Sequence, residues 1–214
     1  MLGRIATSVL LVLGLTAVSA APAAAQMADW PITFKAGINF TNLSVDEDLL
    51  GIEPDGRSGL LAGVSFSKPI RDQFSAQIEA LITQKGAKIT DFDGFGAEYK
   101  ARINYLEIPV LGRYSFRLND DANAHVLAGP SFSFKLSDSQ ELDDVKIDDD
   151  GSVDVAGFDF GFVIGAALEM KKWVFDMRYT FGLSNVNDGS ALFPSDIVEV
   201  KNRAFSVSVG YRFR

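Results

Sequence analysis

Apolar and polar residues alternate along eight segments of the chain. This period of two predicts β-strands, because successive side chains of a strand point to opposite faces. The last segment is typical, with Phe205, Val207, Val209, Tyr211 and Phe213 on one face. The predicted strands cover residues 32–40, 60–67, 74–83, 102–116, 126–135, 158–169, 173–182 and 204–214.

The connections between these strands alternate between short and long. This alternation is typical of an eight-stranded antiparallel up-and-down transmembrane β-barrel, whose short turns and chain ends lie on the periplasmic side. The sequence therefore predicts an all-β protein that crosses the outer membrane of a Gram-negative bacterium. The short connections are 69–73, 117–123 and 171–172, and the long ones are 41–59, 84–101, 137–157 and 184–203.

A soluble eight-stranded barrel also has strands of alternating apolar and polar residues. The kinds of residue on the two faces of the strands must therefore distinguish a soluble barrel from a membrane barrel. The less apolar face carries many glycines, among them Gly37, Gly63 and Gly129. Glycine weakens a strand, but small residues suit the narrow lumen of an eight-stranded barrel. Aromatic residues such as Trp173 and Tyr211 gather at the turn end of the apolar face, as in an interfacial girdle. Both observations favour the membrane barrel.

The N-terminus resembles a secretory signal. Arg4 precedes the apolar run Ile5 to Val18, and small residues lead to a predicted cleavage site between Ala25 and Gln26. We expect residues 1–25 to be a signal peptide and residues 26–214 to be one barrel domain. An uncleaved anchor is the alternative, but the apolar run is short for a membrane span.

Composition narrows the function classes. The chain has 20 basic and 28 acidic residues, a formal net charge of -8 and no cysteine. This balance excludes an electrostatic basis for nucleic-acid binding, and the lack of cysteine excludes disulfides and thiolate metal sites. We expect outer-membrane lipids as partners and no nucleic acid, and we expect the barrel to act as a monomer.

Charged residues on the inward face form the main candidate site. Buried charges must be paired, so five bases and five acids in a narrow lumen predict an ion-pair network. A gated proton or ion path through the same residues is the functional alternative. The predicted network comprises Lys35, Glu79, Glu107, Arg113, Lys135, Asp159, Glu169, Asp176, Arg178 and Arg212.

The long connection 137–157 is strongly acidic. Asp148, Asp150 and Asp154 alternate in a way that could bind a divalent cation, although the spacing does not match an EF-hand. A solvated acidic loop is the alternative. We predict no other metal and no cofactor.

The chain has a single histidine, His125, at the start of the fifth predicted strand. That position lies at the periplasmic end, so it does not suit chemistry on outer-leaflet lipids. We interpret His125 as a polar residue at a strand start, and we expect no enzyme activity.

Five segments together carry a family resemblance: 34–43, 78–88, 104–109, 128–130 and 210–213. They resemble the PorT-like outer-membrane β-barrel family, whose members are described as porin-like. The resemblance implies an eight-stranded barrel that the barrel-assembly machinery inserts.

We therefore expect a non-enzymatic barrel with a filled lumen and a structural or interaction role through its long acidic loops. The partner on the surface or in the periplasm is not specified by the sequence. The alternatives are a narrow porin-like channel for small solutes and an accessory factor in protein secretion or outer-membrane assembly.

Overall fold

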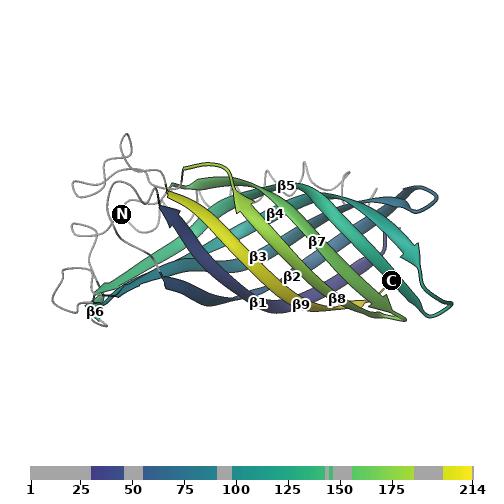
Figure 1. Ribbon diagram of the computed structural model, residues 1–214, viewed down its shortest axis with the longest axis horizontal. Coiled ribbons are helices and arrows are strands. Elements are labelled where there is room, and N and C mark those ends of the chain that lie inside the picture. The colour runs from purple at the N-terminus through teal and green to yellow at the C-terminus, as the bar shows by residue number, and fades with distance from the viewer. Residues whose placement is uncertain are drawn as a thin grey trace, which may run out of the picture.

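The computed structural model describes residues 30–45, 55–90, 98–142, 145–146, 156–185 and 200–213. Almost all of these residues lie in β-strands, and eight of the strands form the wall of a barrel (Figure 1). The eight are β1 (Ile32–Val45), β2 (Asp55–Arg71), β3 (Phe74–Thr90), β4 (Glu98–Arg117), β5 (Ala122–Leu142), β7 (Phe158–Met170), β8 (Trp173–Gly182) and β9 (Val200–Arg212).

The wall closes because every one of these strands has an antiparallel partner on each side. The sheet runs β4-β3-β2-β1-β9-β8-β7-β5, and β5 also pairs with β4. The first and last strands join over thirteen residue pairs, from Thr33↔Arg212 to Val45↔Val200. A ninth strand, β6 (Val145–Lys146), only extends the far end of β5 as a short hairpin. The predicted eight-stranded antiparallel barrel is confirmed.

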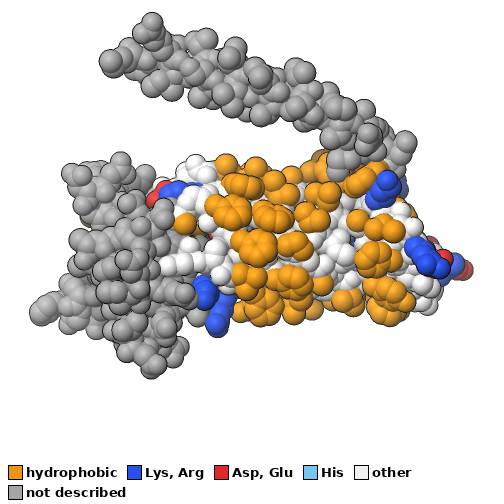
Figure 2. Space-filling model, turned by 90° about the horizontal axis from the view of Figure 1, so that it is seen from above, with side chains coloured by type: hydrophobic (Ala, Val, Ile, Leu, Met, Phe, Trp, Pro, Cys, Tyr) orange, Lys and Arg blue, Asp and Glu red, His pale blue; other side chains and the backbone are white. Residues whose placement is uncertain are grey.

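The two faces of the strands differ as the alternation predicts. On β1, Thr33, Lys35 and Asn39 are buried, whereas Phe34 and Phe40 are about half exposed, at 54% and 49%. Figure 2 shows that outward apolar side chains form a broad band across the face of the barrel in view, and exposed large apolar residues come from all eight wall strands. A barrel in water would gain nothing from this exposed apolar band, so the soluble alternative is wrong.

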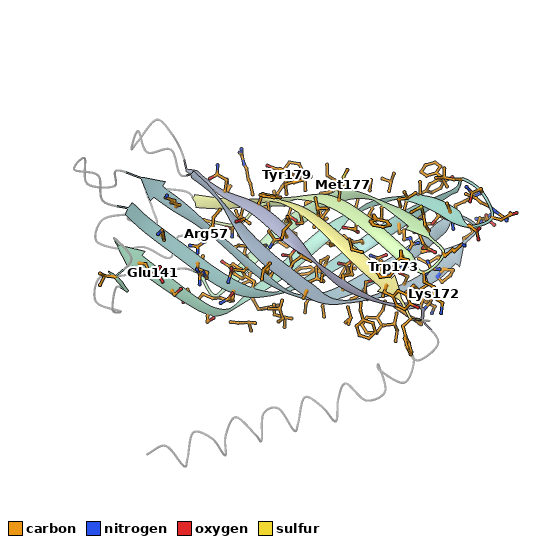
Figure 3. All side chains as sticks on the ribbon, turned by 90° about the horizontal axis from the view of Figure 1, so that it is seen from below. Arg57, Glu141, Lys172, Trp173, Met177 and Tyr179 are labelled. Carbon is orange, nitrogen blue, oxygen red and sulfur yellow. The ribbon has the colours of Figure 1, made fainter. Side chains whose placement is uncertain are left out.

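The ends of the barrel differ. One end, the turn end, carries the tight turns Asp72–Gln73 and Lys171–Lys172 and the end of β9. The other, the loop end, carries the strand ends that the longer segments connect. Figure 3 shows Lys172 and Trp173 at the turn end, and Arg57 at the loop end.

Aromatic side chains line the outer surface at the turn end. Trp173 packs edge to face on Tyr211 with ring centroids 5.2 Å apart, and Tyr114 packs on Phe116 at 4.9 Å. Rings of this kind at the edge of the apolar band suit the membrane interface, because they offer an apolar body and a polar edge.

The strands are longer at the loop end than predicted. Antiparallel pairing continues to Val45 on β1, Thr90 on β3 and Leu142 on β5. Sequence alternation missed these extensions because a strand beyond the membrane has water outside it, so its outward residues need not be apolar. The connecting segments are correspondingly shorter than expected.

Pro109 lies in the middle of β4 and has no backbone N–H to donate, so a bulge or irregular pairing is expected there. Register is unchanged from Ile108↔Phe132 to Gly112↔Ala128, so β5 passes Pro109 without a bulge. On the β3 side, partner pairs are interrupted between Ile78↔Val110 and Leu81↔Glu107. The register of β4 against β5 shifts elsewhere, between Asn104 and Tyr105.

Residues 1–25, the predicted signal peptide, lie outside the described residues. In the part of the chain that is described, no helix is both long and apolar enough to cross a membrane.

Candidate functional site in the barrel lumen

Four charged side chains meet in the interior of the barrel and form the central cluster: Lys35, Glu79, Asp176 and Arg178. Lys35 Nζ lies 3.1 Å from a carboxylate oxygen of both Glu79 and Asp176. Arg178 donates two hydrogen bonds to Glu79, at 2.8 and 3.1 Å, and two to Asp176, both at 2.7 Å. Two bases and two acids are therefore fully paired, which buried charges require.

The central cluster crosses the lumen rather than following the wall. Glu79 lies on β3 and Arg178 on β8, and β2, β1 and β9 separate these strands in the sheet. Their direct contact must therefore pass through the interior. All four side chains are buried.

A second group, the turn-end cluster, surrounds Glu169 on β7. Arg113 donates to its Oε2 at 2.9 Å, and Arg212 also forms an ion pair with this oxygen. His125 Nε2 lies 3.3 Å from it and 2.7 Å from Arg113 Nη2. Two bases share one carboxylate, so the turn-end cluster has an excess of positive charge.

The contacts of His125 link three strands at the turn end. His125 Nε2 lies between a donor, Arg113 Nη2 at 2.7 Å, and an acceptor, Glu169 Oε2 at 3.3 Å, so these contacts fit a ring proton on either nitrogen. His125 Nδ1 lies 2.9 Å from Ser115 Oγ. Ser115, His125 and Glu169 therefore form a chain of polar contacts from β4 through β5 to β7.

Closer to the loop end, Lys85 pairs with Glu107 at 3.0 Å. Ser131 Oγ donates to Glu107 at 2.9 Å, and Lys85 Nζ lies 5.4 Å from the centroid of the Tyr105 ring. This outer pair joins β3 to β4 and is buried. It is electrically neutral by itself.

The last two residues of the predicted network lie near the loop end and do not pair with each other. Lys135 is partly exposed and lies 3.5 Å from Asp138 on its own strand. Asp159 is buried and accepts hydrogen bonds from Ser184 and Asn202, both at 2.8 Å.

Apolar side chains fill another part of the interior. The apolar cluster consists of Leu111, Leu127, Val163, Ala167 and Val174, which come from β4, β5, β7 and β8. A small cavity lies between the central cluster and the outer pair. The space in it that the centre of a water molecule can occupy measures about 20 Å³. A single water needs roughly 10–15 Å³ by this measure, so the cavity holds one or two waters.

The structure brings eight of the ten predicted lumenal residues into three groups, with Asp159 and Lys135 outside them. Sequence reasoning missed Lys85 because the predicted third strand stopped at Thr83, although Lys85 continues the inward parity. It also treated His125 as a strand-start residue, whereas parity with Leu127 places it inside. Extending the alternation by one or two residues at each strand end would have found both.

The candidate cation ligands Asp148, Asp150 and Asp154 lie outside the described residues. Within the described ranges, no three histidine, cysteine, aspartate or glutamate side chains are grouped to hold a metal ion.

Solved structures share the fold at low sequence identity. OprG from Pseudomonas aeruginosa has a TM-score of 0.51 at 13% identity, over 86% of this chain and 96% of that one. Ail of Yersinia pestis has a TM-score of 0.47 at 13% identity, over 86% and 99%. The outer membrane enzyme PagL has a TM-score of 0.46 at 12% identity, over 85% and 98%.

No curated protein matches the chain significantly by sequence. A family model described as "Outer membrane protein beta-barrel domain" matches residues 24–188, which is well over half of the chain. This match agrees with the closed barrel, its outward apolar band and its charged lumen. The chain therefore belongs to the outer membrane protein beta-barrel domain family and is a protein of the Gram-negative outer membrane.

Proposed function

We propose that the protein is a non-conducting membrane anchor that displays acidic segments at the cell surface. The observation that carries this proposal is the central cluster, because it crosses the lumen and leaves none of its four charges unpaired. A channel would need a continuous column of water through the same space.

The apolar cluster supports the same conclusion. Leu111, Leu127 and Val163 are at most 2% exposed, so their side chains pack against neighbours and not against a water-filled pore. The cavity of about 20 Å³ beside the central cluster is too small for a column of water. Solute passage would require several buried ion pairs to separate at once, which is costly.

The segments that connect the strands at the loop end carry the surface role in this proposal. In the sequence, residues 46–54, 91–97, 143–144, 147–155 and 186–199 contain no lysine, arginine or histidine. Such segments attract cations or basic partners from a distance. Their acidic residues are Asp46, Glu47, Asp48, Glu53, Asp91, Asp93, Asp143, Asp144, Asp148, Asp149, Asp150, Asp154, Asp188, Asp196 and Glu199.

Planar-bilayer recording tests the lumen. We expect the wild-type barrel to show no steady conductance, because side chains occupy its interior. The double variant Glu79→Ala/Arg178→Ala removes two crossing side chains without changing the net charge, and it leaves Lys35 paired with Asp176. We expect this variant to conduct.

The matched control is Arg117→Ala/Asp120→Ala, which removes an exposed ion pair at the turn end. We expect this control variant to show no steady conductance, like the wild type. Steady ohmic current through the wild-type barrel would contradict the proposal and favour the porin-like alternative.

A role in secretion or outer-membrane assembly is the second candidate, and it rests on the PorT-like motifs of the sequence. Such a factor would act through the periplasmic turns, among them Asp72–Gln73 and Lys171–Lys172. Capture of periplasmic partners by the wild-type barrel, lost when these two turns are replaced, would support it. Insertion by the barrel-assembly machinery and a monomeric state are part of both proposals.

We also propose that the protein is not an enzyme. The place of Ser115, His125 and Glu169 at the turn end supports this, since outer-leaflet lipids lie at the opposite end of the barrel. Hydrolysis of a phospholipid or an acyl ester by the purified barrel, abolished by Ser115→Ala, would contradict it.

A further inference from the structure

Asp159 is the one lumenal carboxylate, among the described residues, that is buried without a basic partner. Its side chain is 3% exposed, and its two hydrogen bonds come from the neutral groups Ser184 Oγ and Asn202 Nδ2. An isolated buried carboxylate is very unfavourable unless a cation or a proton compensates it. By contrast, Glu79, Glu107 and Glu169 each contact at least one base.

The basic side chains near Asp159 have other partners. Lys85 pairs with Glu107 and donates to Ser133 Oγ, and Ser133 is the in-register neighbour of Asp159 on β5. Lys135 pairs with Asp138, and Arg57 at the loop end donates to the carbonyl of Ala101. Among the described residues no ion pair joins Asp159 to a base, so the compensating charge can come from outside the chain.

Tyr105 gives a second, independent indication of a ligand. Its ring is fully buried and reaches from β4 to the neighbourhood of Asp159 and Asn202. Its hydroxyl oxygen makes no hydrogen bond within 3.5 Å, and Asn202 is a polar neighbour beyond that distance. A buried hydroxyl without a partner costs about 1–3 kcal/mol, so an unfilled contact at this point needs a reason.

We propose that Asp159 and Tyr105 bind a small monovalent cation at the loop end of the lumen. Asn202 and Ser184 are positioning residues, since each holds one carboxylate oxygen and leaves a lone pair on it free for the ion. The Tyr105 hydroxyl oxygen completes the contact from β4, which only β5 separates from β7 in the sheet. Oxygen ligands of this kind suit an alkali ion or a primary ammonium group.

The charge of the site favours a monovalent over a divalent cation. Calcium takes six to eight oxygens, commonly with several carboxylates among them. Among the four residues of the site Asp159 is the single acidic side chain, and Asp138 nearby is already paired with Lys135, so one positive charge neutralises the site. The site is also distinct from the acidic residues Asp148, Asp150 and Asp154.

Thermal unfolding of the full barrel in detergent micelles tests the site. Chloride salts of sodium, potassium and methylammonium are compared with choline chloride at equal ionic strength, so that only the cation changes. Against choline, we expect the preferred cation to raise the melting temperature by about 2–4 °C. The three small cations distinguish an alkali site from an ammonium site.

Two variants assign the effect to the site. Asp159→Asn keeps the shape and both hydrogen-bonding neighbours, and should lose the cation response. Tyr105→Phe keeps the ring that fills the lumen, and should weaken the response. The control is Asp120→Asn, which removes an exposed carboxylate at the turn end, and it should respond like the wild type.

Thallium(I) provides a readout that does not depend on the variants folding. We expect its anomalous scattering in crystals of the wild-type barrel to place an ion between Asp159 and Tyr105. Equal melting temperatures in all four salts, a response retained by Asp159→Asn, or the infrared band of a protonated carboxyl at Asp159 would each overturn the proposal.

Discussion

At the scale of single residues, the lumen depends on which charges meet. Counting the inward face predicted five bases and five acids in balance. The structure distributes them unequally: the central cluster is neutral, Arg113 and Arg212 share Glu169, and Asp159 has no base. Equal numbers on a face therefore do not imply equal pairs, because pairing depends on height along the barrel.

Replacing Glu79 with glutamine should destabilise the barrel strongly. The change leaves Lys35 and Arg178 with only Asp176, so one buried positive charge loses its partner. Loss of one member of a buried ion pair costs about 3–5 kcal/mol. Urea unfolding of the barrel in lipid vesicles measures the loss.

Asp120→Asn provides the matched control, because it removes one carboxylate from the exposed Arg117–Asp120 pair. Its effect should stay within about 1 kcal/mol. If Glu79→Gln were as mild as this control, the central cluster would not be the fully desolvated group that the distances indicate.

At the scale of strands, close packing inside the wall explains the inward glycines. Gly63 on β2 faces the lumen, and a Cβ atom built there would lie 2.0 Å from the carbonyl oxygen of Ala80 on β3. No side chain fits at that distance without a shift of one strand. The narrow lumen of the barrel thus limits which side chains fit at particular inward positions.

Gly63→Ala should therefore lower the free energy of unfolding by about 1–3 kcal/mol, the usual cost of overpacking. Gly157→Ala is the control, since nothing lies within 4 Å of the added atom there. The two variants make the same chemical change and differ in the space available. Comparable stabilities in urea unfolding would contradict the close approach of β2 and β3.

The strands themselves could be predicted because their signal is local. Alternation identified all eight, and the faces of Lys35, Glu79 and Arg178 followed from parity alone. The strand ends could not be predicted in this way, since hydrogen bonding continues where the outward face meets water. This is why Lys85 was missed.

At the scale of the whole molecule, charge is distributed along the barrel axis. The turn-end cluster has an excess of positive charge, whereas Asp159 and the acidic connecting segments lie towards the loop end. The formal net charge of -8 is thus the sum over two unlike ends. In the proposed orientation, the more acidic of these ends faces the outside of the cell.

A basic polymer should reveal this asymmetry. We expect the barrel, inserted in neutral vesicles with its loop end outward, to bind polylysine, and binding should weaken as salt screens the charges. Replacing Asp148, Asp149 and Asp150 with asparagine should lower the affinity. Light scattering or surface plasmon resonance measures the change.

Asp120→Asn/Asp121→Asn is the control for polylysine binding, because it removes exposed acids at the turn end, across the membrane from the polymer. Its affinity should equal that of the wild type. Equal losses in both variants would show that overall charge, not the acidic loop end, attracts the polymer.

The sequence by itself determined the architecture and location, because two-residue alternation, glycine on one face and alternating connection lengths are local properties that a membrane and a narrow lumen impose directly. Only the tertiary structure decided which charged side chains pair with each other. Whether Arg178 meets Glu79, whether Lys85 reaches Glu107 and whether Asp159 stays without a base depend on the stagger of strands that are far apart in the sequence. That stagger comes from the closure of the whole barrel.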